Sequence, residues 1–171
     1  MADPFEVVKT GGGKMKILIA YYSDTGNTEK IAQDVEKLLS DQQVSIARVR
    51  PVKNYRDRFT QLLSAVFRRK PPVEAAVTDL EGFDLLVIGA PIWSRRPAPP
   101  MISYIEELQN CTDKPAVTFV SSLAGGYRDS LRKKLEEKGL QVLETLAFKK
   151  AILEETELAK LREAVRRCQA K

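Results

Sequence analysis

The sequence predicts an α/β fold in which an open parallel sheet of five strands carries helices on both faces. Three observations lead to this class. Short apolar runs recur along the chain, segments with helical spacing of apolar residues lie between them, and no period of 20 to 50 residues repeats. Apolar runs of this kind are typical of parallel strands buried on both faces. Alternation with helices then indicates a layered sheet, and the lack of a repeat excludes a solenoid.

The expected strands are short and almost wholly apolar. They are predicted at residues 17–22, 44–49, 85–89, 116–120 and 142–148, with Pro51 closing the second. Crossovers between them should be right-handed. In such sheets ligands bind beyond the carboxyl ends of the strands, at the switch point of the strand order. The loops after the first, third and fourth strands are therefore the places where a site is expected.

The expected helices lie between these strands and after the last one. The first is predicted over residues 28–39, and Gly139 ends the one before the fifth strand. The last helix has acidic residues in its first turn and basic residues in its last, as the helix dipole favours. The inward positions recur at helical spacing: Ile31, Val35, Leu38 and Leu39; Ile102, Ile105 and Leu108; Leu131 and Leu135; Leu158, Leu161, Val165 and Cys168.

Composition excludes several kinds of chemistry. The chain has 171 residues, which fits one domain, and it contains no histidine. Histidine metal ligands, a histidine base and nucleophiles activated by histidine are thereby excluded, and no metal site or catalytic side chain is expected. Cys111 and Cys168 are far apart and are expected to be packed rather than redox-active. Without an apolar run of about 18 residues or a signal-peptide core, a cytoplasmic protein is expected, with no membrane span.

The N-terminal residues and one internal segment stand apart from this pattern. Residues 1–14 show no period and include Gly11–Gly13, which indicates a flexible leader or a remnant of cloning before a domain at 15–171. The segment from Lys53 to Lys70 has six basic residues against Asp57 and carries the whole net charge of +5, so general nucleic-acid binding is not expected. Its apolar residues fall at helical spacing. We expect a basic helix that covers one sheet face, docks an acidic redox partner or contacts anionic lipid.

The first candidate loop lies directly before a helix and is rich in hydroxyl groups. Its residues are Ser23, Asp24, Thr25, Gly26, Asn27 and Thr28. Free N–H groups at a helix N-terminus bind anions, and Gly26 permits close backbone approach. Because no lysine or arginine lies in the loop, a monophosphate held by neutral donors is favoured over a triphosphate. The alternative is an ordinary capped helix, since Ser, Thr and Asn are common caps.

The other two candidate loops offer aromatic and backbone contacts for a flat ligand. The second runs from Gly89 to Pro100, is dense in proline and holds the only tryptophan, Trp93, which could instead fill the core. The third loop has two glycines that permit close backbone approach and Tyr127, which could stack on a ring or simply pack locally. Its candidate residues are Ser121, Ser122, Gly125, Gly126 and Tyr127.

The segment Ile19–Thr28, followed by Ile31 and Ala32, resembles the phosphate-loop signature of the flavodoxin-like family; only Ala20 departs from it. Gly89-x-Pro91-x-Trp93 resembles the second flavin loop of that family, whereas the third loop lacks the acidic residue found in many members. The resemblance spans residues 15–171 and implies a short-chain flavodoxin type with strand order 2-1-3-4-5. It also implies FMN as cofactor, with its phosphate in the first loop and its ring against Pro91, Ile92, Trp93 and Ser94.

Two functional hypotheses follow from this resemblance. The first is an electron carrier that binds FMN and docks with redox partner proteins, which are expected to be acidic. The alternative is an NAD(P)H-dependent flavin or quinone reductase, in which Arg95 and Arg96 would grip a nucleotide phosphate or a quinone oxygen. Fold alone does not separate them, and a binding module without flavin is a third, less favoured hypothesis. In both flavin hypotheses the cofactor does the chemistry and the protein positions it.

Overall fold

The computed structural model describes residues 13–52, 71–75, 77–123, 129–149 and 151–170. The first twelve residues and the basic segment 53–70 lie outside these ranges, so the expected leader and basic helix are not described. Five parallel strands form the main sheet in the order β2-β1-β5-β7-β8, which is the predicted order 2-1-3-4-5. These strands are β1 (Lys16–Tyr21), β2 (Gln43–Arg48), β5 (Leu85–Trp93), β7 (Pro115–Ser122) and β8 (Gln141–Lys149).

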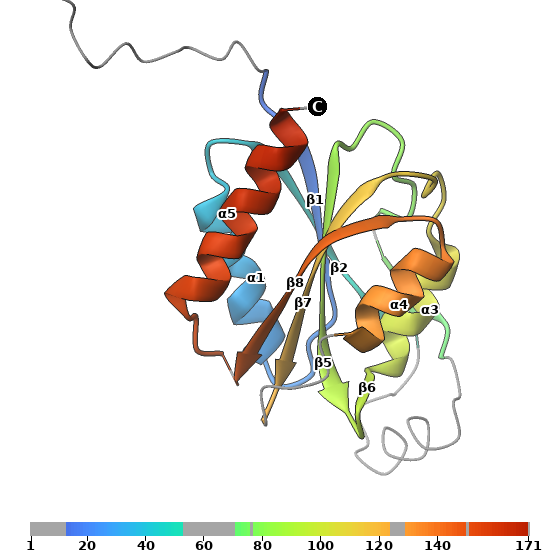
Figure 1. Ribbon diagram of the computed structural model, residues 1–171. Helices are drawn as coiled ribbons and strands as arrows, with labels where there is room; N and C mark the ends of the chain where they lie inside the picture. The colour runs from blue at the N-terminus through green and yellow to red at the C-terminus, as the bar shows by residue number, and fades with distance from the viewer. Residues whose placement is uncertain (1–12, 53–70, 76, 124–128, 150, 171) are drawn as a thin grey trace, which may run out of the picture.

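Helices cover both faces of the sheet, as predicted (Figure 1). One face carries α1 (Asn27–Leu38) and α5 (Glu155–Gln169), and the other carries α3 (Pro99–Glu107) and α4 (Asp129–Glu137). Successive residues of a strand point to opposite faces. Ile17 and Ile19 accordingly join the core under α1 and α5, while Leu18 and Ala20 join the core on the other face. The sheet is thus buried on both sides, which explains its apolar strands.

Most of the inward helix positions are buried as the spacing predicts. Ile31, Leu131 and Leu161 have no exposed surface. Leu38, Ile102, Leu158 and Cys168 are only partly buried, because each lies at the margin of its helix's apolar stripe. The stripe itself is therefore predicted correctly, and its edges are not.

The strand expected at residues 85–89 extends four residues further and ends at Trp93, so Pro91–Trp93 do not belong to an irregular loop. Pro91 lies in register with Ser121 of β7, and its carbonyl oxygen accepts a hydrogen bond of 3.0 Å from the Ala98 N–H. The strand then turns into β6 (Arg96–Pro97), which pairs antiparallel with Ile92–Trp93. A proline is tolerated at position 91 because the β1–β5 ladder ends at Gly89 and does not require its missing N–H.

The turn of this hairpin consists of Ser94 and Arg95, with φ of 46° and 69°. Positive φ at both central residues is the requirement of the turns that join twisted antiparallel strands in two residues. Glycine and asparagine usually occupy such positions, so two other residues there store strain. The strain lies at the carboxyl edge of the sheet, where a ligand is expected.

A second antiparallel pair, β3 (Arg50–Pro51) and β4 (Val73–Glu74), brackets the segment outside the described residues. Arg50 lies opposite Glu74 in this pair, and Val73 is buried against the core under α3. The pair anchors both ends of the bracketed segment next to the carboxyl end of β2.

Gly89 in the middle of β5 is required by packing. A Cβ atom at this position would overlap the Phe119 ring, with Cζ as the nearest atom. Phe119 is fully buried in the core under α1 and α5. The aromatic ring therefore occupies the space that a side chain at position 89 would need.

The last strand, β8, forms one edge of the sheet and is tied to α5 by a buried carboxylate. Oε2 of Glu157 accepts a hydrogen bond of 2.9 Å from the Ala147 N–H, and Oε1 accepts one of 2.7 Å from Nζ of Lys160. Glu157 is only 3% exposed. The cost of burying this charge is offset by the two hydrogen bonds, one of them charge-assisted.

Candidate functional site

The carboxyl ends of β1, β5 and β7 lie side by side and bring the three candidate loops together. Tyr21 is in register with Gly89, and Pro91 with Ser121. The Tyr22 N–H donates to the Gly89 carbonyl oxygen at 3.1 Å, which joins the start of the first loop to β5. The convergence expected from the predicted topology is therefore present at this edge of the sheet (Figure 1).

The first loop leads into α1 without a side-chain cap. Gly26 is the N-cap residue, with φ of 89°, and its own N–H donates to Oγ of Ser23 at 3.1 Å. The first backbone hydrogen bond of the helix runs from the Lys30 N–H to the Gly26 carbonyl oxygen at 2.9 Å. Because Gly26 has no side chain, the N-cap residue itself makes no side-chain cap hydrogen bond. The N–H groups of its first turn remain suited to an anion.

The side chains of this loop differ in accessibility. Asp24 and Thr25 are exposed, Ser23, Gly26 and Asn27 are half-buried, and Thr28 is buried. A Cβ atom at Gly26 would meet no other atom, but its left-handed backbone favours glycine. The loop therefore places the accessible hydroxyl residues Ser23 and Thr25 and the left-handed turn at Gly26 directly before the helix N-terminus, a setting that suits an anion.

The hairpin after β5 packs against the start of the first loop. The Trp93 ring meets the Tyr22 ring edge to face, with centroids 5.8 Å apart and planes at 82°. Trp93 is half-buried and also packs against the core under α3, while Tyr22 is only 4% exposed. Packing thus buries part of the Trp93 side chain, and the rest of it is accessible. Pro91 and Ile92 are half-buried, and Ser94, Arg95 and Arg96 at the tip are exposed.

Only part of the third loop falls within the described residues. Ser121 is buried and Ser122 is half-buried at the end of β7, whereas Gly125, Gly126 and Tyr127 lie outside the described ranges. Leu123 follows directly and is 76% exposed. Ile152, beyond the end of the neighbouring β8, is 60% exposed. The edge of the sheet at which the loops meet is therefore partly apolar.

A charged network behind the first loop is missing from the sequence prediction. Nη1 of Arg48, at the end of β2, donates to Oε1 of Glu29 in the first turn of α1 at 2.8 Å. The Tyr21 hydroxyl donates to the same oxygen at 3.2 Å. Burial, and then the Glu29 charge, raise the pKa of Tyr21, while Arg48 and Arg50 lower it less. The acidic residue in the first helical turn was the one signal for this network in the sequence.

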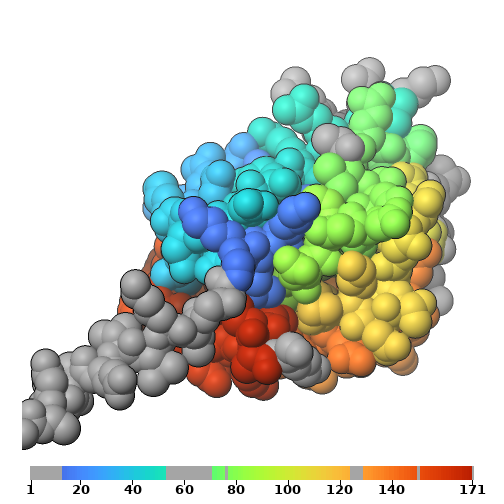
Figure 2. All heavy atoms as spheres, turned by 90° about the horizontal axis from the view of Figure 1, so that it is seen from above, coloured from blue at the N-terminus to red at the C-terminus, as the bar shows by residue number. Residues whose placement is uncertain are grey.

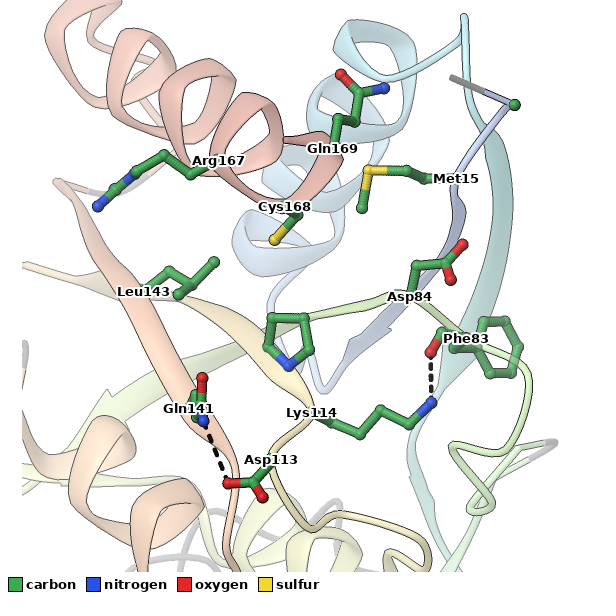
Figure 3. Close-up of a pocket in the computed structure, with 12 residues that line it drawn as sticks. Met15, Phe83, Asp84, Asp113, Lys114, Gln141, Leu143, Arg167, Cys168 and Gln169 are labelled. Carbon is green, nitrogen blue, oxygen red and sulfur yellow. Dashed lines mark hydrogen bonds between the residues drawn. The ribbon is translucent and has the colours of Figure 1, made fainter. Parts of the chain in front are cut away.

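A cavity of about 710 Å³ lies at the opposite edge of the sheet, where the strands begin. Figure 2 shows this edge, with the end of α5 beside the start of β1. Figure 3 shows Met15, Leu143 and Cys168 around the cavity, with Nζ of Lys114 donating to the Phe83 carbonyl oxygen at 2.7 Å. Its volume suits a small ligand, but its position does not, because such sheets bind ligands at their carboxyl edge. We therefore place the candidate site at the three loops and not in this cavity.

The described residues contain no cluster of three cysteine or acidic residues that could hold a metal ion. Cys111 is buried and Cys168 half-buried, and neither forms a disulfide. None of the described helices is long and apolar enough to span a membrane.

Comparison with protein families identifies one whose model covers most of this chain. The family model described as NADPH-dependent FMN reductase matches residues 14–152, a range that includes all three candidate loops. No relative was found among the curated proteins.

Solved structures with the same fold include flavoproteins. A flavoprotein from Lactobacillus acidophilus, solved in complex with FMN, is 24% identical, covers 76% of this chain and 91% of its own, and has a TM-score of 0.62. The two-electron reduced flavodoxin of Megasphaera elsdenii is 20% identical, with coverage of 88% and 98% and a TM-score of 0.61. At these identities the likeness establishes the flavodoxin-like fold.

Proposed function

The chain belongs to the NADPH-dependent FMN reductase family, and on that premise we propose that it is an FMN-dependent oxidoreductase that takes electrons from a reduced nicotinamide nucleotide. The observation that carries the proposal is the family match over residues 14–152, a range that contains all three candidate loops. NADPH is the donor to expect from the family, and NADH is the natural comparison.

The described residues fit FMN. The phosphate would be held by Ser23, Thr25, Asn27 and Thr28 with the N–H groups around Gly26, because α1 begins there and a helix N-terminus suits an anion. Asp24 of the same loop also belongs to the proposed set of FMN-binding residues. One short loop of neutral donors suits one terminal phosphate, and no second glycine-rich nucleotide motif occurs in the sequence. The ring would lie near Pro91, Ile92, Trp93 and Ser94, with Ser121 and Ser122 at the end of the adjacent strand. Gly125, Gly126 and Tyr127 complete the proposed set.

When bound, FMN would supply the hydride-accepting and electron-donating chemistry that no side chain of this protein offers. The chain has no histidine, so its own residues would bind and orient rather than act as a histidine acid or base. Arg95 and Arg96 project from the exposed tip of the hairpin beside the proposed ring site. Guanidinium groups there could bind a nucleotide phosphate or the oxygen of an electron acceptor.

An electron carrier, which the sequence alone favours, is the second candidate. The flavodoxin fold supports it, since flavodoxins share this architecture. The family match favours the reductase, because it covers residues 14–152 and names a reduced nucleotide as the electron source. A carrier would instead require docking of redox partner proteins, expected to be acidic.

Anaerobic titration of the FMN-loaded protein with NADPH separates the two candidates. We expect the visible absorption of the flavin to bleach rapidly on addition of NADPH, far faster than for the same concentration of free FMN. A parallel titration with NADH measures nucleotide preference. Flavin that stays oxidised with both nucleotides, but is reduced by a chemical reductant, would support the carrier and overturn the reductase.

A further inference from the structure

We propose that Arg48, by pairing with Glu29, removes a repulsion that would otherwise weaken the binding of a phosphorylated flavin relative to an unphosphorylated one. The inference rests on the proposed function, because it concerns the flavin phosphate. The first loop holds no lysine or arginine, and it contains one exposed carboxylate, Asp24. A positive charge that acts on a phosphate bound to this loop must therefore come from a neighbouring element.

Arg48 is held at the first turn of α1 by its ion pair with Glu29. Its Nη1 lies 2.8 Å from Oε1 of Glu29, three residues beyond the Gly26 N-cap. With a rise of about 1.5 Å per residue, the backbone of Glu29 lies about 4–5 Å along the axis from that N-cap. A carboxylate in the first turn of the helix that would hold the phosphate repels that phosphate unless its charge is offset.

The network holds the Glu29 carboxylate in an ion pair, which offsets its negative charge. Tyr21 and Arg48 donate to the same oxygen of Glu29, from the ends of β1 and β2. Tyr21 keeps its proton, because burial and the Glu29 charge raise its pKa. Arg50 also lies near enough to lower that pKa, although it faces Glu74 across β3 and β4. Arg48 thus cancels the charge that Glu29 would otherwise place beside the phosphate.

Partial burial limits how far solvent screens this pair. The Arg48 side chain is 40% exposed and the Glu29 side chain 27%. Lys30 is exposed on the outer side of the same helical turn, so it is a weaker counter-charge than the anchored arginine. The effect of the pair on a dianion should therefore be moderate and should decrease with ionic strength.

The test measures the dissociation constants of FMN and riboflavin for four proteins: wild type, Arg48→Gln, Glu29→Gln and the double variant. Flavin fluorescence reports binding to the full chain. We expect Arg48→Gln to weaken FMN about three- to tenfold and to change riboflavin by less than about twofold, since riboflavin has no phosphate. Glu29→Gln should bind FMN at least as well as wild type, and the double variant should restore most of the loss.

Two further measurements keep the test decisive. Arg48→Lys retains the charge and should retain the ratio of FMN to riboflavin affinity, even if Arg48→Gln folds poorly. The loss in Arg48→Gln should shrink in about 0.5 M salt. Equal weakening of both flavins in Arg48→Gln would indicate a purely structural role and overturn the inference while the proposed function stands. A wild-type protein that binds neither flavin would overturn both.

Discussion

Tyr22 and Trp93, which are 71 positions apart in the sequence, meet edge to face with their planes at 82°. Tyr22 is the last residue before the first loop, and Trp93 is the last residue of β5 before the hairpin turn. Edge-to-face contacts of this kind contribute about 0.5–1.5 kcal/mol beyond their buried area. This contact couples the proposed phosphate loop to the proposed ring site.

Trp93 should report flavin binding directly. Because it is the only tryptophan, we expect its fluorescence to be strongly quenched when FMN binds. Trp93→Ala should weaken FMN by about 1–3 kcal/mol, the range found for stacking of bases on aromatic residues. Tyr22→Leu serves as the control: it removes the edge contact, keeps the tryptophan and should leave most of the quenching. Unquenched emission in the FMN-loaded protein would place the indole away from the ring.

Thr25 tests the phosphate loop. Thr25→Val keeps the shape of the side chain but removes a hydroxyl that would donate to a charged phosphate, an interaction of about 1.5–3 kcal/mol. FMN affinity measured by isothermal titration calorimetry should fall about tenfold or more. Thr25→Ser, which keeps the hydroxyl, should bind almost as well as wild type. Unchanged affinity in a folded Thr25→Val protein would mean that the phosphate binds elsewhere.

Gly89 tests the packing of the central strand. Gly89→Ala places a methyl group where the Phe119 ring already lies. Overpacking of a core costs about 1–3 kcal/mol or more, so the urea midpoint should fall clearly. The double variant Gly89→Ala, Phe119→Leu should lose less stability than the sum of the two single changes. Additive losses would show that the ring is not the obstacle.

Arg95 and Arg96 test the electrostatics of the hairpin tip. A cation about 8 Å from the flavin at an effective dielectric near 20 interacts by about 2 kcal/mol, and screening at an exposed tip reduces this to a fraction. Because positive charge favours the reduced flavin anion, the two-electron potential should be less negative than in an acidic flavodoxin. Changing both arginines to Gln should lower it. A potential that stays constant or rises, by anaerobic potentiometry, would exclude this role.

Tyr104 gives the protein a predictable sensitivity to alkali. Burial raises the pKa of its phenol far above the ordinary value of 10.0, and the hydroxyl donates to the Val77 carbonyl oxygen at 2.7 Å. Above pH 10 the unfolded chain releases this proton while the folded protein keeps it, so stability is complete below pH 10 and falls as pH rises further.

The matched variant for this prediction is Tyr104→Phe. It should be less stable by about 1 kcal/mol near neutral pH, because it loses one buried hydrogen bond. Its urea midpoint should then fall less steeply than that of wild type between pH 9 and pH 11. Identical slopes would show that the phenol does not titrate differently in the two states.

The layered sheet was predictable because its strands are apolar on both faces, whereas each helix is apolar along one face only. Ile17–Ile19 and Leu85–Ile88 have no polar side chain, and only burial on both faces explains such runs. The strand order and the meeting of three loops at one edge then follow from the topology. The first loop lies directly before α1, as predicted, and its role in holding a phosphate stays a prediction.

The hairpin at Trp93 was not predictable in the same way. Its turn, Ser94–Arg95, lacks the glycine or asparagine that signals positive φ, and Pro91 indicates the end of a strand. The contacts of Tyr22 with Trp93 and of Glu29 with Arg48 join residues far apart in sequence, whose pairing has no periodic pattern. Such contacts depend on strand register, which sequence patterning fixes only for buried faces.

The hydrogen bond from the Ala147 N–H to the Glu157 carboxylate has a consequence for the protein in concentrated solution. An outer strand with unpaired N–H groups is a template on which another molecule can add a strand of its own and begin to aggregate. Here the last helix of the same chain supplies a charged group to that edge, so an incoming strand would have to displace a buried anion. Glu157→Leu would remove this protection, and we expect it to convert a monodisperse protein into one that self-associates.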